Sequence, residues 1–143
     1  MKFKLVNSNF DKETGISSAT IATELGFFTG YSRLHEEDKQ NISTFCGCRY
    51  AELRAMLKYI KKRISLYSYQ IKTLNNYLLY LKSKKDFDKN SLECKNLYKY
   101  MNQVIKEKKS WEVRGSNLSA AILKNINDRE VALKKLNKTH FKD

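Results

Sequence analysis

The chain has 143 residues and carries 28 lysines and arginines against 15 aspartates and glutamates, which gives a net charge of +13. Hydrophobic residues make up 41% and proline is absent, a composition that excludes wholesale disorder and collagen-like or proline-rich chains. Five glycines are too few for the many turns of an all-β sandwich. A basic, mainly helical chain of one domain remains.

The first residues of the chain have no apolar core of the kind found in signal peptides. No run of residues approaches the roughly 18–20 apolar positions that a membrane-spanning helix needs. We therefore expect a cytoplasmic protein without a membrane partner. In that compartment thiols stay reduced, so Cys46, Cys48 and Cys94 are expected to be free.

Residues 1–45 hold five basic and six acidic side chains, and their pattern predicts a small β-rich head with a short helix. β-Branched and small residues favour strands here, and Gly15 suits a turn that needs a positive φ. The expected antiparallel meander has strands at residues 2–6, 17–23 and 27–32. The acidic residues after His35 favour a short helix that ends before a sharp turn at Gly47.

Residues 46–143 hold 23 basic and nine acidic side chains and predict a long helical hairpin. A heptad repeat without interruption is the most specific signal in the sequence and is typical of a coiled coil. It consists of Leu53, Leu57, Ile60, Ile64, Tyr67, Ile71, Leu74, Leu78 and Leu81.

The polar residues 83–90 predict the turn between the two antiparallel helices, and Ser91 is the expected N-cap of the second helix. A weaker seam continues after it, at Leu97, Met101, Val104, Trp111, Leu118, Ile122, Leu133 and Leu136. Gly115 interrupts this seam and allows a kink, a close contact or a break.

Clusters of basic residues on this hairpin are candidates for binding nucleic acid, because cationic stripes release counterions from phosphate backbones. The candidates are Lys58, Lys61, Lys62, Arg63, Lys72, Lys106, Lys108, Lys109 and Arg114. Candidates for stacking on bases or for a binding hot spot are Tyr59, Tyr69 and Trp111. The alternative is a solvated coiled-coil flank, in which Trp111 is a core residue and tyrosines cover lysine stems.

Catalytic and metal-binding patterns are weak in this sequence. Cys46-Gly-Cys48 lacks partners at the spacing of a zinc site, and small residues at a turn explain it. The two histidines, His35 and His140, have no nucleophile and orienting residue at a recognisable spacing. We therefore expect a protein that is not an enzyme and has no cofactor or metal.

Three segments carry a resemblance to a known family: Gly26-Phe-Phe-Thr-Gly-Tyr31, Glu37-Asp38, and Phe45-Cys-Gly-Cys-Arg-Tyr-Ala-Glu-Leu-Arg-Ala55 before the lysine-rich heptads. Over residues 10–85 the chain resembles small proteins of phages and integrated mobile elements of Gram-positive bacteria. The resemblance implies an accessory or anti-defence role in the host cytoplasm and transfers no functional residue.

These observations predict an α+β fold, with the head at residues 1–45 and the basic hairpin at 46–143 forming one folding unit, as a monomer or a homodimer. Three functions stay open. The first is a non-enzymatic accessory protein that binds nucleic acid through the basic faces. The second is a phage inhibitor of a host defence nucleoprotein, of the anti-CRISPR type. The third is a structural coiled-coil adaptor.

Overall fold

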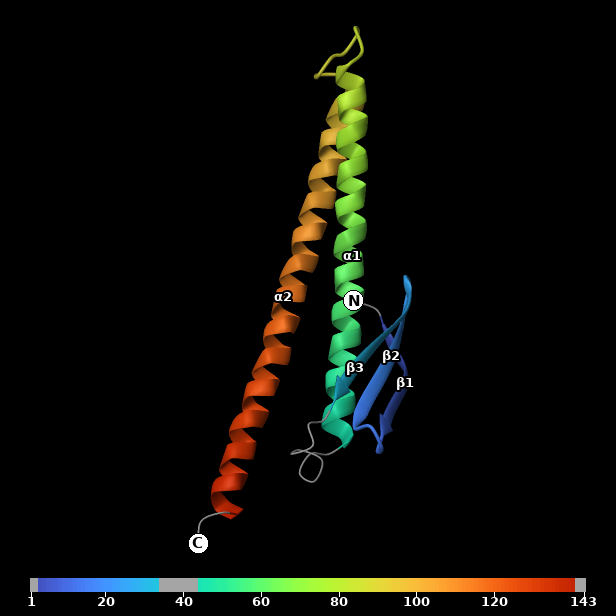
Figure 1. The fold of residues 1–143 in the computed structure, drawn as a ribbon. Helices are drawn as coiled ribbons and strands as arrows, with labels where there is room; N and C mark the ends of the chain where they lie inside the picture. Colours follow the sequence, from blue (N-terminus) through green and yellow to red (C-terminus); the bar gives the residue numbers. More distant parts are fainter. Residues whose placement is uncertain (1–2, 34–43, 141–143) are drawn as a thin grey trace. The chain divides into compact units, whose positions relative to one another are not determined.

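The computed structural model describes residues 3–33 and 44–140, with side chains for residues 3–33 and 47–124. Three strands precede two long helices, so the α+β prediction is confirmed (Figure 1). The elements are β1 (Lys4–Asp11), β2 (Ile16–Thr23), β3 (Gly26–Arg33), α1 (Thr44–Lys82) and α2 (Leu92–His140).

The strands form the predicted antiparallel meander, in the order β1-β2-β3. β2 and β3 pair without interruption from Ile16↔Arg33 to Thr23↔Gly26. β1 extends further than the expected residues 2–6, because Asn7 to Asp11 pair with β2 despite their low strand propensity. The register shifts once in β1, between Leu5 and Asn7.

Both turns of the meander use a glycine with a positive φ. Gly15 (φ 72°) ends the predicted turn that follows Asp11, and its backbone N–H donates to the Asp11 carbonyl at 2.8 Å. Gly26 (φ 110°) closes the β2–β3 turn, where the Thr23 hydroxyl donates to the Gly26 carbonyl at 2.8 Å. An L side chain is strained in this region of φ, which explains the two glycines.

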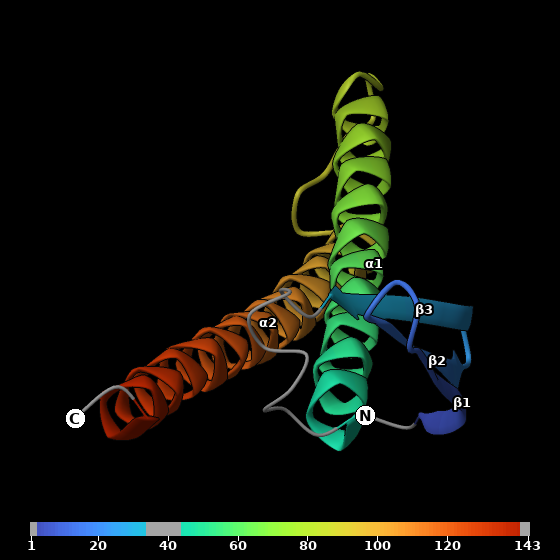
Figure 2. The same ribbon diagram turned by 60° about the horizontal axis from the view of Figure 1, so that its bottom comes forward.

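The sheet lies against the N-terminal part of α1, and small residues permit a very close approach (Figure 2). A Cβ atom on Gly30 of β3 would collide with the backbone of α1 at Ala51 and Ala55. A Cβ atom on Gly47 of α1 would collide with the hydroxyl of Ser17 in β2. Sheet and helix therefore meet almost backbone to backbone over this stretch.

Larger side chains fill the rest of this interface. Tyr59 of α1 is 1% exposed and is the largest fully buried side chain. Its hydroxyl bonds to the carboxylate of Glu24, and its ring meets the edge of Phe28 at a centroid distance of 5.6 Å. Ile21 of β2 is completely buried. The buried hydroxyl of Tyr59 thus keeps a polar partner in Glu24, because an unpaired buried hydroxyl would be destabilising.

The chain divides into two compact units, one of residues 1–59 and 115–143 and the other of residues 60–114. The second unit, called the hairpin unit below, holds the end of α1, the connecting turn and the start of α2. Its helices pack on each other through Leu78, Leu81, Cys94, Leu97 and Met101, with Leu74 and Phe87 at the margin. These residues belong to the predicted heptad seam, except Cys94 and Phe87.

The connection between the helices agrees with the sequence. α1 ends at Lys82, and the Ser91 hydroxyl accepts the backbone N–H of Cys94 at 3.2 Å as an N-cap. α2 continues through the buried Gly115 without a break in its helical assignment. Two polar contacts also join the helices: Gln70 with Tyr100, and the Tyr77 hydroxyl with Glu93 at 2.6 Å.

The prediction of a sharp turn at Gly47 is wrong. Gly47 lies inside α1, and its missing Cβ makes room for Ser17 rather than for a turn. The predicted short helix after His35 falls at residues 34–43, outside the described residues. The boundary at residues 45/46 marks the change in charge and stays a prediction as a folding boundary.

Candidate functional site

The hairpin unit concentrates positive charge. Residues 60–114 contain 14 basic and five acidic side chains, a net charge of +9. Two of the acidic side chains are engaged within the unit, because Glu93 accepts from Tyr77 and Glu112 pairs with Lys108 at 3.6 Å. This unit is therefore the strongest attractor of anions that the structure describes.

Four lysines form a row on α2, called the α2 lysine row below: Lys95, Lys99, Lys106 and Lys109. Their spacing of four, seven and three residues places them on one face of the helix, away from the buried Leu97, Met101 and Val104. All four are exposed, and among the described residues none of them lies within ion-pair distance of a carboxylate. The row is about 21 Å long, at a rise of 1.5 Å per residue.

The outer face of α1 in the hairpin unit differs from the α2 lysine row. Lys62, Leu66, Tyr69, Thr73, Asn76 and Tyr80 share it at spacings of three and four, and all are exposed. Tyr69, at 71% exposure, fulfils the condition for the predicted stacking role. Of the predicted candidates, this face therefore carries Tyr69 for stacking and Lys62 for a phosphate contact. Lys61 and Lys72 are also exposed and lie beside this face.

Arg63, Trp111 and Arg114 form one cluster between the helices. The guanidinium of Arg63 lies 4.8 Å from the centre of the Trp111 ring, and that of Arg114 lies 4.7 Å from it. Trp111 is buried, which agrees with a core residue and leaves no free ring face for stacking on a base. Arg63 comes from α1 and Arg114 from α2, and both place their charge against the same ring of the fold.

Lys58 and Tyr59 belong to the other unit, beside the sheet. The Lys58 amine donates to the Thr29 carbonyl at 2.6 Å and lies 5.4 Å from the centre of the Tyr31 ring. Tyr59 is buried, so its prediction as a stacking residue is wrong. The seam pattern could not show this, because the partners of Tyr59 are far along the chain: Glu24 lies in the β2–β3 turn and Phe28 in β3.

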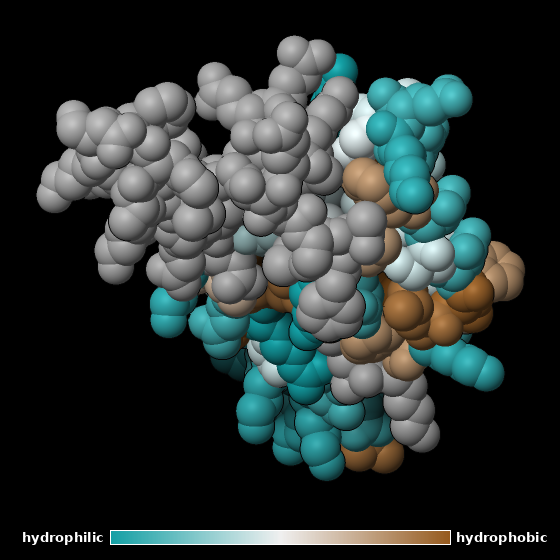
Figure 3. Space-filling view, turned by 90° about the horizontal axis from the view of Figure 1, so that it is seen from below, coloured by the Kyte–Doolittle hydropathy of each residue, from teal (hydrophilic) through white to brown (hydrophobic). Residues whose placement is uncertain are grey.

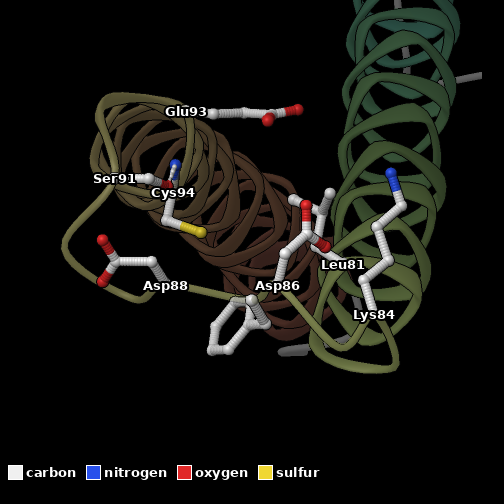
Figure 4. A pocket seen from close by; sticks show the side chains of 8 residues that line it. Leu81, Lys84, Asp86, Asp88, Ser91, Glu93 and Cys94 are labelled. Atoms are coloured by element: carbon white, nitrogen blue, oxygen red, sulfur yellow. Dashed lines mark hydrogen bonds between the residues drawn. The ribbon is translucent and has the colours of Figure 1, made fainter.

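An open pocket of about 230 Å³ lies at the turn of the hairpin (Figure 4). Leu81, Phe87 and Cys94 supply its apolar wall, while Lys84, Asp86, Asp88, Ser91 and Glu93 line its rim. The described residues contain no group of three histidine, cysteine or acidic side chains that could hold a metal ion. The pocket offers mixed charges at its rim and no arrangement of nucleophile and base.

Comparison with protein-family models, with curated proteins and with solved structures finds no match to this chain. Among the helices in the described part of the chain, none combines the length and apolarity needed to cross a membrane.

Two groups of surface residues were not among the candidates predicted from the sequence. Lys95 and Lys99 complete the α2 lysine row. Lys95 lies eleven residues before Lys106 and Lys99 lies seven residues before it, and these helical spacings were a usable signal. Phe27 and Tyr31, four apart on a strand, are exposed together on the sheet. Strand alternation puts Phe27 and Tyr31 on the same face of the sheet. The sequence does not show which of the two faces α1 covers.

Proposed function

We propose that the protein is a non-enzymatic accessory protein that binds nucleic acid through the basic faces of its helical hairpin. The observation that carries this proposal is the α2 lysine row, which is exposed and lacks carboxylate partners among the described residues. Its length of about 21 Å corresponds to about six phosphates of one duplex strand, at 3.4 Å per step.

The charge of the hairpin unit supports the same conclusion. Fourteen basic against five acidic side chains on a two-helix unit create self-repulsion that a bound polyanion relieves. Lysine, rather than arginine, makes up the exposed row, and its flexible point charge suits phosphates better than base edges. We therefore expect affinity without strong sequence preference.

The test compares two variants of the full chain with equal loss of charge. One replaces Lys95, Lys99, Lys106 and Lys109 by glutamine, and the control replaces Lys61, Lys62, Lys72 and Lys82, which lie on α1. Binding to labelled oligonucleotides is measured by fluorescence anisotropy at several salt concentrations. The row variant should lose more affinity, and its salt slope should be less negative by about 3, at 0.7 per phosphate contact on single strands.

Equal losses in both variants would assign binding to net charge rather than to the row. Unchanged binding in the row variant would remove the α2 face from the proposal altogether. Circular dichroism of both variants checks that the helices remain intact, since glutamine is about as good a helix former as lysine.

A structural adaptor that self-associates is the second candidate. Its support is a set of exposed apolar side chains on the hairpin unit: Leu66, Leu79, Leu92 and Val113. Single exposed apolar residues are common on monomers, so only the oligomeric state distinguishes the adaptor from the nucleic-acid-binding protein. Sedimentation velocity over a wide concentration range should show a constant species for the nucleic-acid-binding protein and a growing one for the adaptor.

A further inference from the structure

The face of the sheet that points away from α1 carries two exposed aromatic rings. Phe27 is 73% exposed and Tyr31 is 55% exposed, both on β3. Gly30 and Ser32, which alternate with them, are buried, and Gly30 lies against the backbone of α1. Because side chains alternate between the faces of a strand, Phe27 and Tyr31 stand together on the outer face.

The residues paired with these rings on β2 have small side chains, which leaves the rings exposed. Ala22 lies opposite Phe27 and Ser18 lies opposite Tyr31 in the neighbouring strand. Between the rings, the hydroxyls of Thr20 and Thr29 bond to each other at 2.7 Å. Figure 3 shows apolar side chains exposed among hydrophilic ones on the sheet side of this view.

Cationic side chains border the same face. The Lys58 amine lies 5.4 Å from the centre of the Tyr31 ring while it donates to the Thr29 carbonyl. Arg54 donates to the Tyr31 carbonyl at 2.8 Å, and Lys4 pairs with Ala22 at the Phe27 end. The Lys58 ammonium has three N–H donors, and one of them bonds to the Thr29 carbonyl at the edge of β3. The others can donate to an anion.

The distance between the rings selects the kind of ligand. Four residues along a strand span about 13 Å, nearly four times the 3.4 Å step between neighbouring base pairs. Bases stacked in a duplex cannot place one base on each ring. Unstacked bases of a single strand can, and aromatic side chains on an open sheet are a general means of holding them.

We propose that the outer face of the sheet holds two unpaired bases of a single-stranded nucleic acid, one on Phe27 and one on Tyr31, with Lys58 beside the backbone phosphate. This inference rests on the proposed function for the class of ligand, and it adds a strand preference to it. The hydroxyls of Thr20 and Thr29 lie between the two rings, so the rings and the exposed Ile16 at the Tyr31 end of β2 do not form one continuous apolar patch of the kind that marks a protein interface.

The experiment measures affinity of the full chain for a single-stranded oligonucleotide and for the matching duplex. Phe27→Ala and Tyr31→Ala should each weaken single-strand binding about tenfold, which is within the range for one stacked base. Duplex binding should stay unchanged. The matched variants Phe27→Tyr and Tyr31→Phe keep a ring and should keep single-strand affinity.

Photocrosslinking with oligonucleotides that contain 5-iodouracil separates this inference from the proposed function. Crosslinks in the β3 peptide that disappear in the two alanine variants support the sheet platform. Salt-sensitive binding with crosslinks confined to residues 60–114 would overturn the platform and leave the hairpin proposal intact. Crosslinks at β3 that persist after glutamine replacement of the α2 lysine row, with unchanged salt dependence, would overturn the hairpin proposal instead.

Discussion

The guanidinium of Arg63 lies 4.8 Å from the centre of the Trp111 ring, and this contact joins the two helices of the hairpin unit. Arg114 lies 4.7 Å from the same ring. A buried indole in contact with two cations gains stabilisation from both. Arg63 and Arg114, two of the expected nucleic-acid contacts, therefore act first as structural residues.

Arg63→Met keeps the aliphatic stem and removes the charge. We expect the free energy of unfolding to fall by about 1 kcal/mol, the size of a partly desolvated cation–π contact. Urea denaturation followed by far-UV circular dichroism measures it, with Lys62→Met on the exposed face of α1 as the control. Equal stability of the two variants would show that the charge over Trp111 contributes nothing.

Gly30→Ala should be among the most damaging single substitutions in the chain. The added Cβ collides with the carbonyl oxygen of Ala51 and the backbone nitrogen of Ala55. Both atoms belong to the backbone of α1, so neither can move without the helix. We expect a loss of about 3 kcal/mol or more, the upper range for overpacking. Gly26→Ala is the control, because its Cβ meets nothing within 4 Å and costs about 1–2 kcal/mol through its positive φ.

Thermal denaturation of the two glycine variants tests the close contact between sheet and helix. A Gly30→Ala protein that melts at the temperature of the Gly26→Ala protein would mean that sheet and helix do not approach as closely as described.

Ser91→Ala removes the N-cap of α2. The Ser91 hydroxyl accepts the backbone N–H of Cys94 at 3.2 Å, and loss of such a cap costs about 1 kcal/mol. The same change at Ser110, which is exposed inside α2, should be neutral or slightly stabilising because alanine is the better helix former. Chemical denaturation of both variants gives the comparison, and a neutral Ser91→Ala would refute the cap.

The hydrogen bond from Tyr77 to Glu93 raises the pKa of the Tyr77 phenol above its ordinary value, with the negative charge of Glu93 as the next cause. The protonated phenol is favoured in the folded chain. The contribution to stability is therefore fully present below the unfolded pKa of about 10 and is lost as pH rises through the folded pKa.

Tyr77→Phe should remove this pH dependence. Stability of the two proteins is compared by urea denaturation from neutral pH to above pH ~10, the ordinary phenol pKa. The advantage of the native chain over the variant should shrink at the alkaline end. A constant difference across this range would mean that Glu93 does not bond to the neutral phenol.

Local patterns predicted much of the fold. The β-branched run at residues 17–23 became β2, and the heptad residues Leu78 and Leu81 pack against Leu97 and Met101. Ser91 caps α2 as expected. Such features depend on neighbours three to seven residues away, which a single sequence displays directly.

Other features depend on partners far along the chain. Tyr59 lies off the heptad seam and is buried, in contact with Glu24 of the β2–β3 turn and Phe28 of β3. Gly30 and Gly47 serve a close approach of sheet and helix, whereas their sequence context suggested a strand residue and a turn. Placing Phe27 and Tyr31 on an open face required knowledge of which face α1 covers.

The most direct test of nucleic-acid binding is the salt dependence of affinity for the unaltered full chain. Nuclease-treated protein is titrated into a labelled single-stranded oligonucleotide between about 50 and 200 mM salt, the range where phosphate contacts change affinity most visibly. We expect the logarithm of the association constant to fall linearly with the logarithm of salt, with a slope of about −3 or steeper for at least four phosphate contacts. Absence of binding at the lower salt concentration, despite a net charge of +13, would contradict the proposal and direct the search to a protein partner.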